Sequence, residues 1–328
     1  MKYKIAVVGA TGLVGREVLK ILQERGLQEN DFYFYASSFS AGKMIKFAGA
    51  EHKILQLTDE IYEQNLDFAL FCTKEMVSGQ YIYKLSQRGV KVVDFSSLYR
   101  KMKPLVVPEI NSEDIKGNII CNPNCSTIGA VMALYEIHKK FGFERVVYST
   151  YQAVSGAGKD ALDDLKNNGE KLKKFDYPIF NNLIPYIGKI DKRGYCTEEN
   201  KMVYETRKIL HDKYIKISAT CVRVPIEVCH GESINFQTTK NCSLNQIKQV
   251  LKNTKGVLFV DDYPHFPMPL ETVGQDLVFV GRVRKDYSQN NTFNMFVVSD
   301  NLRKGAAQNG VQILQELIKM KEKVQKIN

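Results

Sequence analysis

Cys125 is placed for nucleophilic chemistry, within the stretch Asn122-Pro-Asn-Cys-Ser-Thr127. The apolar run from Ile119 to Cys121 predicts a strand before it, and the run from Ile128 to Lys140 predicts a helix after it. A strand, a tight turn and a helix start would hold the sulfur over free backbone N–H groups and at the positive end of a helix dipole. Both stabilise a thiolate and an adjacent oxyanion. Free cysteines are more often buried core residues, but the flanking Asn, Pro, Ser and Thr predict a polar turn here.

A glycine-rich loop follows the first apolar strand, Tyr3 to Val8, and precedes a helical pattern. Its glycines, Gly9, Gly12 and Gly15, depart from the spacing G-x-G-x-x-G but stand in the strand–loop–helix context of a dinucleotide site. Gly9 would permit the tight turn, Gly12 the approach to a pyrophosphate, and Gly15 close packing of helix on strand. A purely structural turn is the alternative reading of this loop.

The end of the second predicted strand, Phe32 to Ala36, bears on the choice of cofactor. It lacks the Asp or Glu that would bind a ribose 2′-hydroxyl, and runs instead into Ser37-Ser38-Phe39-Ser40, with Lys43 close by. An acid at this point would repel a 2′-phosphate, so its absence favours NADP over NAD, with NAD still possible.

The elements that must position these residues fall into two groups. Up to about residue 124, short strands alternate with helical patterns such as Met76 to Arg88, which predicts an α/β domain with a Rossmann-like, mostly parallel sheet. Residues 125–300 are richer in β patterns and predict a second, α+β domain. Its expected helices include 160–173 and 198–210. A final amphipathic helix, within 301–328, is expected to pack back on the first domain.

Composition excludes several other classes of protein. The 328 residues carry a net charge of +10, but the charges are dispersed and form no basic stripe, so no nucleic-acid partner is expected. Seven cysteines without a CxxC pair indicate neither a disulfide framework nor a metal site. No apolar stretch approaches the roughly 20 residues of a membrane span, and no signal peptide is expected before the first strand. A cytoplasmic location is expected.

Six segments, in order, resemble the aspartate-semialdehyde dehydrogenase family, and the resemblance covers nearly the whole chain. They are Gly9–Gly15, Asn124–Thr127, Tyr151–Gly158, Arg223-Val-Pro225 with His230-Gly-Glu232, Asp276–Arg284 and Asp300–Gln312. The resemblance implies NADPH-dependent reduction of L-4-aspartyl phosphate to L-aspartate 4-semialdehyde and phosphate, and the reverse oxidation. This reaction belongs to lysine, threonine and methionine biosynthesis. The resemblance also implies that the second domain forms the subunit interface of a homodimer or homotetramer.

The family match implies three catalytic roles. Cys125 is the nucleophile that forms a thioester, Gln152 orients the substrate or acyl intermediate, and His230 is the acid–base. An imidazole suits that role because it changes charge near neutral pH. Arg223 matches the arginine that holds the substrate carboxylate in two parallel bonds. Seven residues of extended strand span about 23 Å, so Arg223 and His230 can share a site only if the chain turns near Pro225.

The remaining site residues follow from the same match. Glu198 is expected to bind the substrate ammonium, with Glu199 as the alternative register, and Lys201 and Arg100 to bind phosphate. Asn124 is expected to contact substrate. The expected cofactor contacts are Gly9, Thr11, Gly12, Leu13, Val14, Ser37, Ser38, Thr73, Ser155, Gly156 and Asn309.

The chain departs from the family at three places. Phe39 stands where the family often has an arginine that binds the 2′-phosphate, and Phe95 stands where it commonly has Asn. The loop Cys72-Thr73-Lys74-Glu75 replaces a stretch that is usually rich in Gly and Ser. Lys74 is a candidate for a compensating phosphate contact.

Two alternatives remain. N-acetyl-glutamyl-phosphate reductase shares the architecture and thiol chemistry, but its acetylated substrate has no ammonium group and would not need Glu198. A catalytically silent nucleotide-binding homologue is the other, and retention of Cys125, Gln152, Arg223 and His230 speaks against it.

Overall fold

The computed structural model describes residues 2–167 and 170–327 and divides the chain into two compact units. The first unit comprises Met1–Pro123 and Ala306–Asn328, and the second comprises Asn124–Gly305. The second boundary lies five residues beyond the predicted one because Asn301 is bound into the second unit. Its side chain donates to Ser155 Oγ at 2.9 Å and accepts the backbone N–H of Cys229 at 2.8 Å.

The first unit contains a parallel sheet with the strand order β5-β2-β1-β6-β7-β8, so the predicted Rossmann-like sheet is confirmed. Its strands are β1 (Lys4–Val8), β2 (Asp31–Ala36), β5 (Leu55–Gln56), β6 (Phe68–Phe71), β7 (Lys91–Asp94) and β8 (Ile119–Cys121). A small hairpin of β3 (Met44–Phe47) and β4 (Ala50–Lys53), which the sequence patterns did not predict, follows β2.

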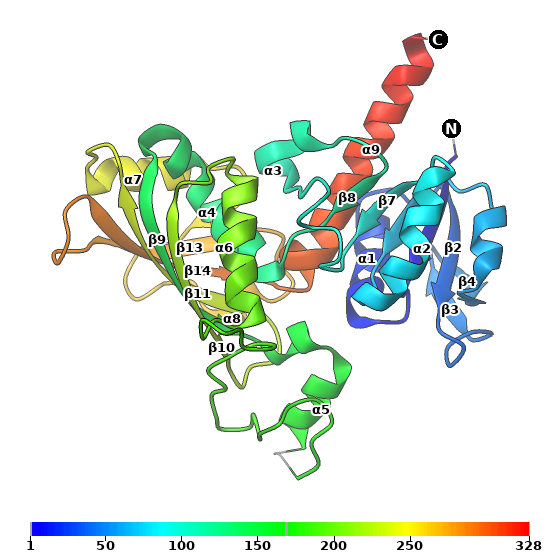
Figure 1. The fold of residues 1–328 in the computed structure, drawn as a ribbon, viewed down its shortest axis with the longest axis horizontal. Helices are drawn as coiled ribbons and strands as arrows, with labels where there is room; N and C mark the ends of the chain where they lie inside the picture. The colour runs from blue at the N-terminus through cyan, green and yellow to red at the C-terminus, as the bar shows by residue number, and fades with distance from the viewer. Residues whose placement is uncertain (1, 168–169, 328) are drawn as a thin grey trace. The chain divides into compact units, whose positions relative to one another are not determined.

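Helices cover both faces of this sheet, as parallel strands require. Alternate residues of β1 enter two separate hydrophobic cores: Val7 packs with α1 (Leu13–Glu24) and α9 (Gln308–Ile327), and Val8 with α2 (Glu75–Gln87). The last helix therefore completes the first unit (Figure 1). Shorter helices are η1 (Asp59–Glu63), α3 (Pro108–Asn111) and η2 (Ser112–Asp114).

The strand order reverses between β1 and β6, because β2 lies on one side of β1 and β6 leads away on the other. The loops that leave the carboxyl ends of these two strands meet at this point, where α/β sheets bind their ligands. Gly9 follows β1 and Thr73 follows β6. A Cβ at Gly9 would lie 2.4 Å from the carbonyl oxygen of Cys72.

The second unit is built on a mixed sheet with the order β10-β9-β11-β14-β13-β12 (Figure 1). Its strands are β9 (Phe143–Gln152), β10 (Lys216–Arg223), β11 (His230–Thr238), β12 (Val257–Phe259), β13 (Val278–Lys285) and β14 (Thr292–Ser299). Three helices pack on it: α4 (Cys125–Phe141), α6 (Thr197–Ile209) and α7 (Leu244–Lys252). Short segments η3 (Val154–Ala157) and α8 (Pro269–Thr272) complete the unit, and the π-helical turn η4 (Arg303–Ala307) leads from it into α9.

One predicted helix, 160–173, is shorter than expected, and residues 168–169 of it lie outside the described residues. The structure has a single helix here, α5 (Lys159–Lys166). The buried carboxylate of Asp164 then accepts the backbone N–H groups of Lys173, Lys174 and Phe175 at 2.6 to 3.0 Å. These bonds fold the following segment back onto α5 and replace the continuation of the helix.

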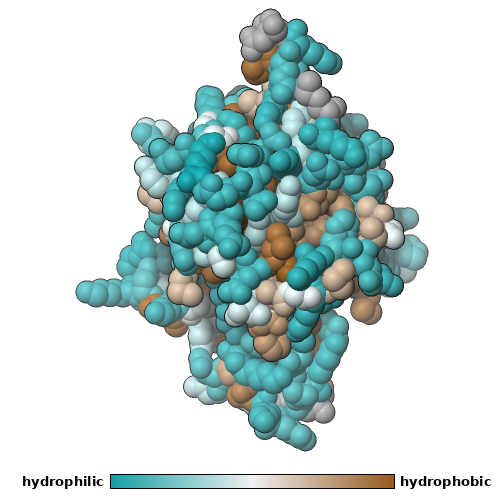
Figure 2. Space-filling view, turned by 90° about the vertical axis from the view of Figure 1, so that its right-hand side faces the viewer, coloured by the Kyte–Doolittle hydropathy of each residue, from teal (hydrophilic) through white to brown (hydrophobic). Residues whose placement is uncertain are grey.

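The surface drawn in Figure 2 is mainly hydrophilic, with hydrophobic residues in small groups. None of the helices in the described part of the chain combines the length and the apolar character needed to cross a membrane.

Candidate active site

Cys125 is the first residue of α4, directly after the N-cap Asn124. The helix begins three residues earlier than the apolar pattern indicated, so the sulfur lies at the end where backbone N–H groups are free. The turn around it is polar, as predicted, but it is buried: Ser126 and Thr127 have no exposed surface. Only Cys125 in this group is half-buried. A Cβ at Gly305 would lie 3.0 Å from Cys125 Cβ, so only glycine allows η4 to pack this closely.

Three neighbouring strands bring the other candidate side chains to the same level of the sheet. Gln152, at the end of β9, is paired with Arg223 of the parallel strand β10 and with His230 of the antiparallel strand β11. The chain turns between β10 and β11, in the segment that contains Pro225. The turn that the seven-residue spacing required is therefore present, and Arg223 and His230 flank the same glutamine.

His230 faces the sulfur of Cys125, with 3.2 Å between Nε2 and Sγ. The backbone N–H of Ala153 donates to Nδ1 at 3.0 Å, so a neutral ring carries its proton on Nε2 and donates toward the sulfur. Burial, and next the charge of Arg223, lower the pKa of His230 to about 3. The expectation of an imidazole that titrates near neutrality is wrong for this structure, because the ring is fully buried beside a cation.

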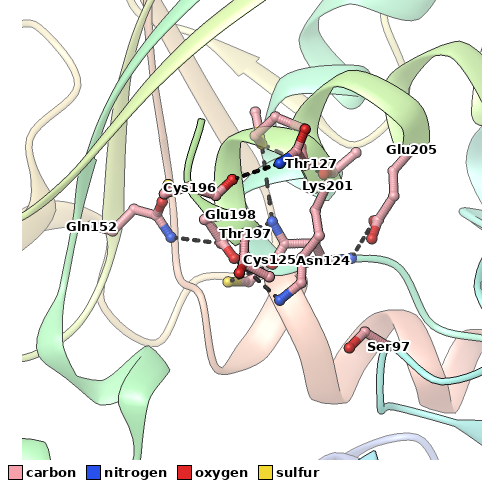
Figure 3. A network of polar contacts seen from close by, with 12 residues as sticks. Ser97, Asn124, Cys125, Thr127, Gln152, Cys196, Thr197, Glu198, Lys201 and Glu205 are labelled. Atoms are coloured by element: carbon pink, nitrogen blue, oxygen red, sulfur yellow. Dashed lines mark hydrogen bonds and ion pairs between the residues drawn. The ribbon is translucent and has the colours of Figure 1, made fainter. Parts of the chain in front are cut away.

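A buried carboxylate, Glu198, lies near Cys125 at the start of α6 (Figure 3). Its Oε1 accepts the side-chain amides of Asn124 at 2.9 Å and Gln152 at 3.0 Å, and its Oε2 lies 3.4 Å from Lys201 Nζ. Burial alone would raise the pKa of Glu198, but Lys201 and the two amides lower it to about 2. Glu198 is therefore ionised at neutral pH, and an anion is available for a cationic ligand group.

Glu199, the alternative register, points elsewhere. Its carboxylate accepts the backbone N–H groups of Cys196 and Cys221. Of the two glutamates, only Glu198 is grouped with Asn124 and Gln152.

Arg223 is buried, and its Nη1 donates to the carbonyl of Ala153 at 2.6 Å. Gly156 packs against both Arg223 and His230: a Cβ there would lie 3.3 Å from Arg223 Nη1 and 3.5 Å from the imidazole. Ser155, held by Asn301, lies in the same turn. Ser155 and Gly156, expected to contact cofactor, thus lie in the second unit beside the arginine and histidine.

In the first unit, the glycine-rich loop forms the predicted turn. Gly9 has a φ of +83°, a conformation that favours glycine. A Cβ at Gly15 would lie 2.1 Å from the Gly9 carbonyl oxygen, so the third glycine permits close packing of α1. Gly12 is the N-cap of α1 and supplies no side-chain acceptor, so the first N–H groups, from Leu13 and Val14 onward, can receive a phosphate.

Polar and basic side chains border this loop at the end of β2. Thr11 Oγ1 lies 3.4 Å from Ser40 Oγ, in the turn that begins with Ser37 and Ser38. The ammonium of Lys43 lies 4.2 Å from the centre of the exposed Phe39 ring. The family often has an arginine at position 39. Here the uncharged Phe39 ring packs against the ammonium of Lys43. Lys74, at the start of α2, is also exposed.

Asn309, in α9, is fully buried within the first unit. Its amide donates to the Val106 carbonyl at 2.9 Å and to Asn122 Oδ1 at 2.8 Å, while its own Oδ1 has no hydrogen-bond partner among the described residues. A buried acceptor of this kind suits the carboxamide of a nicotinamide. The glycine loop and this acceptor together fit a nicotinamide dinucleotide.

Arg100 and Phe95 also belong to the first unit. Arg100 is buried and donates to the Phe95 carbonyl at 2.9 Å. The Phe95 ring fills the space at Gly310, where a Cβ would lie 2.1 Å from Cζ. An apolar contact with α9 thus occupies the position where the family commonly has Asn.

Two buried glutamates in this part of the second unit were missed in the sequence. Glu205 accepts the backbone N–H of Asn124 at 2.7 Å. Its spacing of seven from Glu198, two helical turns, was an available signal. Glu232 lies two residues after His230, on the same face of β11, and burial raises its pKa well above the usual value. The alternation of side chains along a strand predicts that Glu232 shares a face with His230. Only the packing of α4 on β11 shows that Glu232 is buried.

A parallel dinucleotide-type sheet, together with a thiol–imidazole pair beside a buried carboxylate and a buried guanidinium, defines a two-domain, thiol-dependent dehydrogenase. Residues 4–118 match the semialdehyde dehydrogenase NAD binding domain, and residues 134–304 match the semialdehyde dehydrogenase dimerisation domain. The chain is 47% identical to an aspartate-semialdehyde dehydrogenase of Aquifex aeolicus, over 97% of this chain and 99% of the relative. The chain belongs to the aspartate-semialdehyde dehydrogenase family, as the motifs predicted.

Solved structures agree. Aspartate semialdehyde dehydrogenase II of Vibrio cholerae, complexed with ASA, superposes with a TM-score of 0.94 at 37% identity, covering 97% of this chain and 99% of that one. The aspartate semialdehyde dehydrogenase of Candida albicans, with NADP, has a TM-score of 0.76 at 26% identity, with the same coverage.

Proposed function

We propose that this chain catalyses the reversible, NADP-dependent conversion of L-4-aspartyl phosphate to L-aspartate 4-semialdehyde and phosphate, in lysine, threonine and methionine biosynthesis. The observation that carries the proposal is the grouping of Cys125 and His230 with Gln152, Glu198 and Arg223 in one buried cluster. This cluster offers a nucleophile, an anion and a cation, which an amino-acid acyl phosphate requires.

Each charged group of the proposed substrate is matched with a side chain of opposite charge. Arg223 would bind the α-carboxylate, because a planar guanidinium forms two parallel bonds to a carboxylate. Glu198 would bind the ammonium, since its lowered pKa keeps it ionised. Lys201 and Arg100 would bind the phosphate, and Asn124, already hydrogen-bonded to Glu198, would contact substrate.

The covalent steps take place on Cys125. The thiolate attacks the acyl carbon, a C–S bond forms, the bond between that carbon and the phosphate oxygen breaks, and phosphate leaves. The bound dinucleotide supplies or accepts the hydride. After reduction the C–S bond breaks, which releases the aldehyde and restores the thiolate. No net proton is needed on the sulfur once the thiolate has formed.

His230 acts in this scheme first as a hydrogen-bond donor. Its Nε2–H stabilises the thiolate and the oxyanion of the tetrahedral intermediate. Arrival of an anionic substrate beside the ring would raise the pKa of His230 from its low value, because a nearby negative charge favours imidazolium. His230 would therefore act as an acid–base only when substrate is bound. Gln152, between the two strands, would orient the acyl group.

The cofactor assignment rests on the first unit. Its proposed contacts are the glycine loop (Gly9, Thr11, Gly12, Leu13, Val14), the turn after β2 (Ser37, Ser38), Thr73 and Asn309, with Ser155 and Gly156 from the second unit. We propose NADP in preference to NAD because no acid stands at the end of β2, whereas Lys43 stands in the turn that follows it.

Oligomerisation and location complete the proposal. We propose a cytoplasmic homodimer or homotetramer, formed through the second unit. The cytoplasmic location is proposed because the seven cysteines include no CxxC pair or disulfide-type spacing, which suits a reducing compartment. The match to a dimerisation domain over residues 134–304 supports the choice of surface.

The test is to follow reduction of NADP and NAD, in parallel, with L-aspartate 4-semialdehyde and phosphate. Phosphate-dependent turnover that is faster with NADP is expected. Turnover that does not need phosphate would contradict the acyl-phosphate chemistry.

N-acetyl-glutamate 5-semialdehyde should be assayed beside it as the competing substrate. Because Glu198 is ionised and directed into the cluster, we expect the acetylated substrate to be poor. Preference for it would establish the alternative enzyme, and no turnover with either, in folded protein with a reactive Cys125, would favour a silent homologue.

A further inference from the structure

Two further cysteines lie next to each other in the second unit, outside the proposed chemistry. Cys196 is the N-cap of α6, and Cys221 lies within β10, which packs against α6. Both are buried, with 1% and 0% of their surface exposed. Neither takes part in the steps proposed for Cys125.

A single carboxylate aligns the backbones of the two cysteines. Glu199 Oε2 accepts the backbone N–H of Cys196 at 2.7 Å, and Glu199 Oε1 accepts that of Cys221 at 3.0 Å. Two residues 25 positions apart in the sequence are thus held on the two oxygens of one side chain. The two thiols also contact each other directly. Disulfide formation tolerates only a short separation, and this contact meets that requirement at the sulfurs.

The two thiols differ in their surroundings. Cys196 lies at the N-terminus of α6, where free backbone N–H groups favour negative charge. The contact with the Cys221 thiol lowers the pKa of Cys196, and the backbone N–H groups of Ile187 and Glu199 act in the same direction. The same contact, together with burial, raises the pKa of Cys221, so Cys196 is the thiol of the pair that ionises first.

We propose that Cys196 and Cys221 are a peroxide-sensitive dithiol that closes to an intramolecular disulfide. The Cys196 thiolate attacks one oxygen of hydrogen peroxide, the O–O bond breaks, and the hydroxide that leaves takes up the proton lost by the Cys196 thiol, which gives a sulfenic acid and one water. The Cys221 sulfur then attacks Cys196, the S–O bond breaks, and the hydroxide released takes up the proton of the Cys221 thiol to form a second water. Two thiols are oxidised and one peroxide is reduced to two waters.

A functional consequence follows, and this part rests on the proposed function. Cys196 lies two residues before Glu198, and Cys221 two residues before Arg223. A disulfide bond of about 2.05 Å brings the sulfurs closer than any non-bonded contact. Its formation would pull the start of α6 and the end of β10 together and displace the groups proposed to bind the ammonium and carboxylate. Reductant should restore them.

The chemical step can be tested without any activity, in full-length Cys125→Ser protein treated with hydrogen peroxide. Trypsin should cut the chain into Gly194–Lys201 and Ile217–Arg223, each with one cysteine. We expect these two peptides to be joined without reductant and separate with it. Cys221→Ala in the same background should instead give a dimedone adduct on Cys196. Cys196→Ser, which keeps a residue that suits the N-cap, should give no adduct on Cys221.

The outcomes are separable. Absence of the linked peptide pair at peroxide levels that oxidise other cysteines overturns the proposal, whatever the enzyme's substrate. The effect on the site is measured as the loss of kcat/KM after peroxide that reductant restores. This reversible loss should be about threefold or more larger in wild-type enzyme than in Cys221→Ala. An equal loss in both, with the linked peptides present, would leave the disulfide in place but remove its effect on the site.

Discussion

At the scale of single residues, the surroundings of His230 set its charge. The ring is buried beside Arg223, and the Ala153 N–H occupies Nδ1, so the imidazole stays neutral far below the pH at which a solvated histidine protonates. A neutral Nε2–H can hold a thiolate or an oxyanion without moving a proton. The arrangement therefore serves a reaction in which the sulfur leaves as the same anion that attacked.

The low pKa of His230 predicts how stability changes with pH. In the unfolded chain His230 takes up a proton near pH 6.5, but in the folded chain only near pH 3. The unfolding free energy contributed by this residue is thus complete above about pH 6.5 and is lost as the pH falls toward 3, by about 4 kcal/mol. Chemical denaturation at several pH values should show that the unfolding free energy of His230→Gln depends less steeply on pH than that of the wild type. His265→Gln, at an exposed position, is the control and should behave as wild type.

Replacement of the nucleophile tests the covalent route. Cys125→Ser should lose turnover by about a thousandfold or more, because a hydroxyl is a poor nucleophile without a strong base. Its melting temperature should change little, and so should NADP binding, because the glycine loop belongs to the first unit. Steady-state rates, thermal unfolding and cofactor titration measure these effects, with Cys242→Ser as the matched control. Near-normal turnover in Cys125→Ser would overturn the mechanism.

At the scale of elements, the start of α4 is held by α6. Glu205 accepts the backbone N–H of Asn124, and Glu198, two turns earlier on the same helix, accepts the Asn124 side chain. Helix α6 thereby fixes Asn124, the residue before Cys125, through both its backbone and its side chain. The helix that carries Glu198 and Lys201 is therefore coupled to the position of Cys125.

Removal of the Glu205 carboxylate should weaken this coupling. Glu205→Ala leaves a buried N–H without its acceptor and should lower the unfolding free energy by about 2 kcal/mol. It should also lower kcat, since Asn124 and Cys125 lose their anchor. Glu205→Gln retains an accepting oxygen, so its unfolding free energy and its kcat should both be close to those of the wild type. Urea unfolding and steady-state kinetics would decide. If the two variants behave alike, the hydrogen bond is not what positions α4.

At the scale of the whole molecule, the two units have separate tasks, so their properties should change independently. Lys43→Ala, in the first unit, should raise the KM for NADP about tenfold and leave that for NAD nearly unchanged, because only NADP carries the 2′-phosphate. Lys46→Ala is the control, since it removes an exposed lysine of the neighbouring hairpin. Lys74→Ala, assayed alongside, tests the second candidate cation. Equal effects on both cofactors would contradict the assignment of Lys43.

The second unit should control assembly. Tyr151 lies on the face of β9 opposite Gln152 and is 41% exposed. The centres of the Tyr151 and Phe296 rings are 6.3 Å apart, and the Phe296 ring packs over Gly231. If this face forms the proposed subunit interface, Tyr151→Asp would bury an unpaired charge there and shift the enzyme toward monomer. Light scattering after size exclusion should show the shift, and Tyr287→Asp, at a 94% exposed position, should not. An unchanged mass for Tyr151→Asp would place the interface elsewhere.

The sequence by itself determined the features that depend on neighbouring residues. The strand, turn and helix around Cys125, the glycine loop after β1 and the alternation of strands and helices follow from hydrophobic periodicity and backbone geometry, which act over a few residues. The family motifs added which side chains belong to one site. Once the family match placed Arg223 and His230 in one site, their spacing of seven residues required a turn between them.

The tertiary structure alone decided how those side chains meet and what charge they carry. Gln152 stands between Arg223 and His230 only because β9 pairs with both β10 and β11. The choice of Glu198 over Glu199, and the pairing of Cys196 with Cys221, likewise depend on strands and helices distant in sequence. The low pKa of His230 arises from burial, and desolvation is a property of the whole packed neighbourhood, which no local pattern encodes.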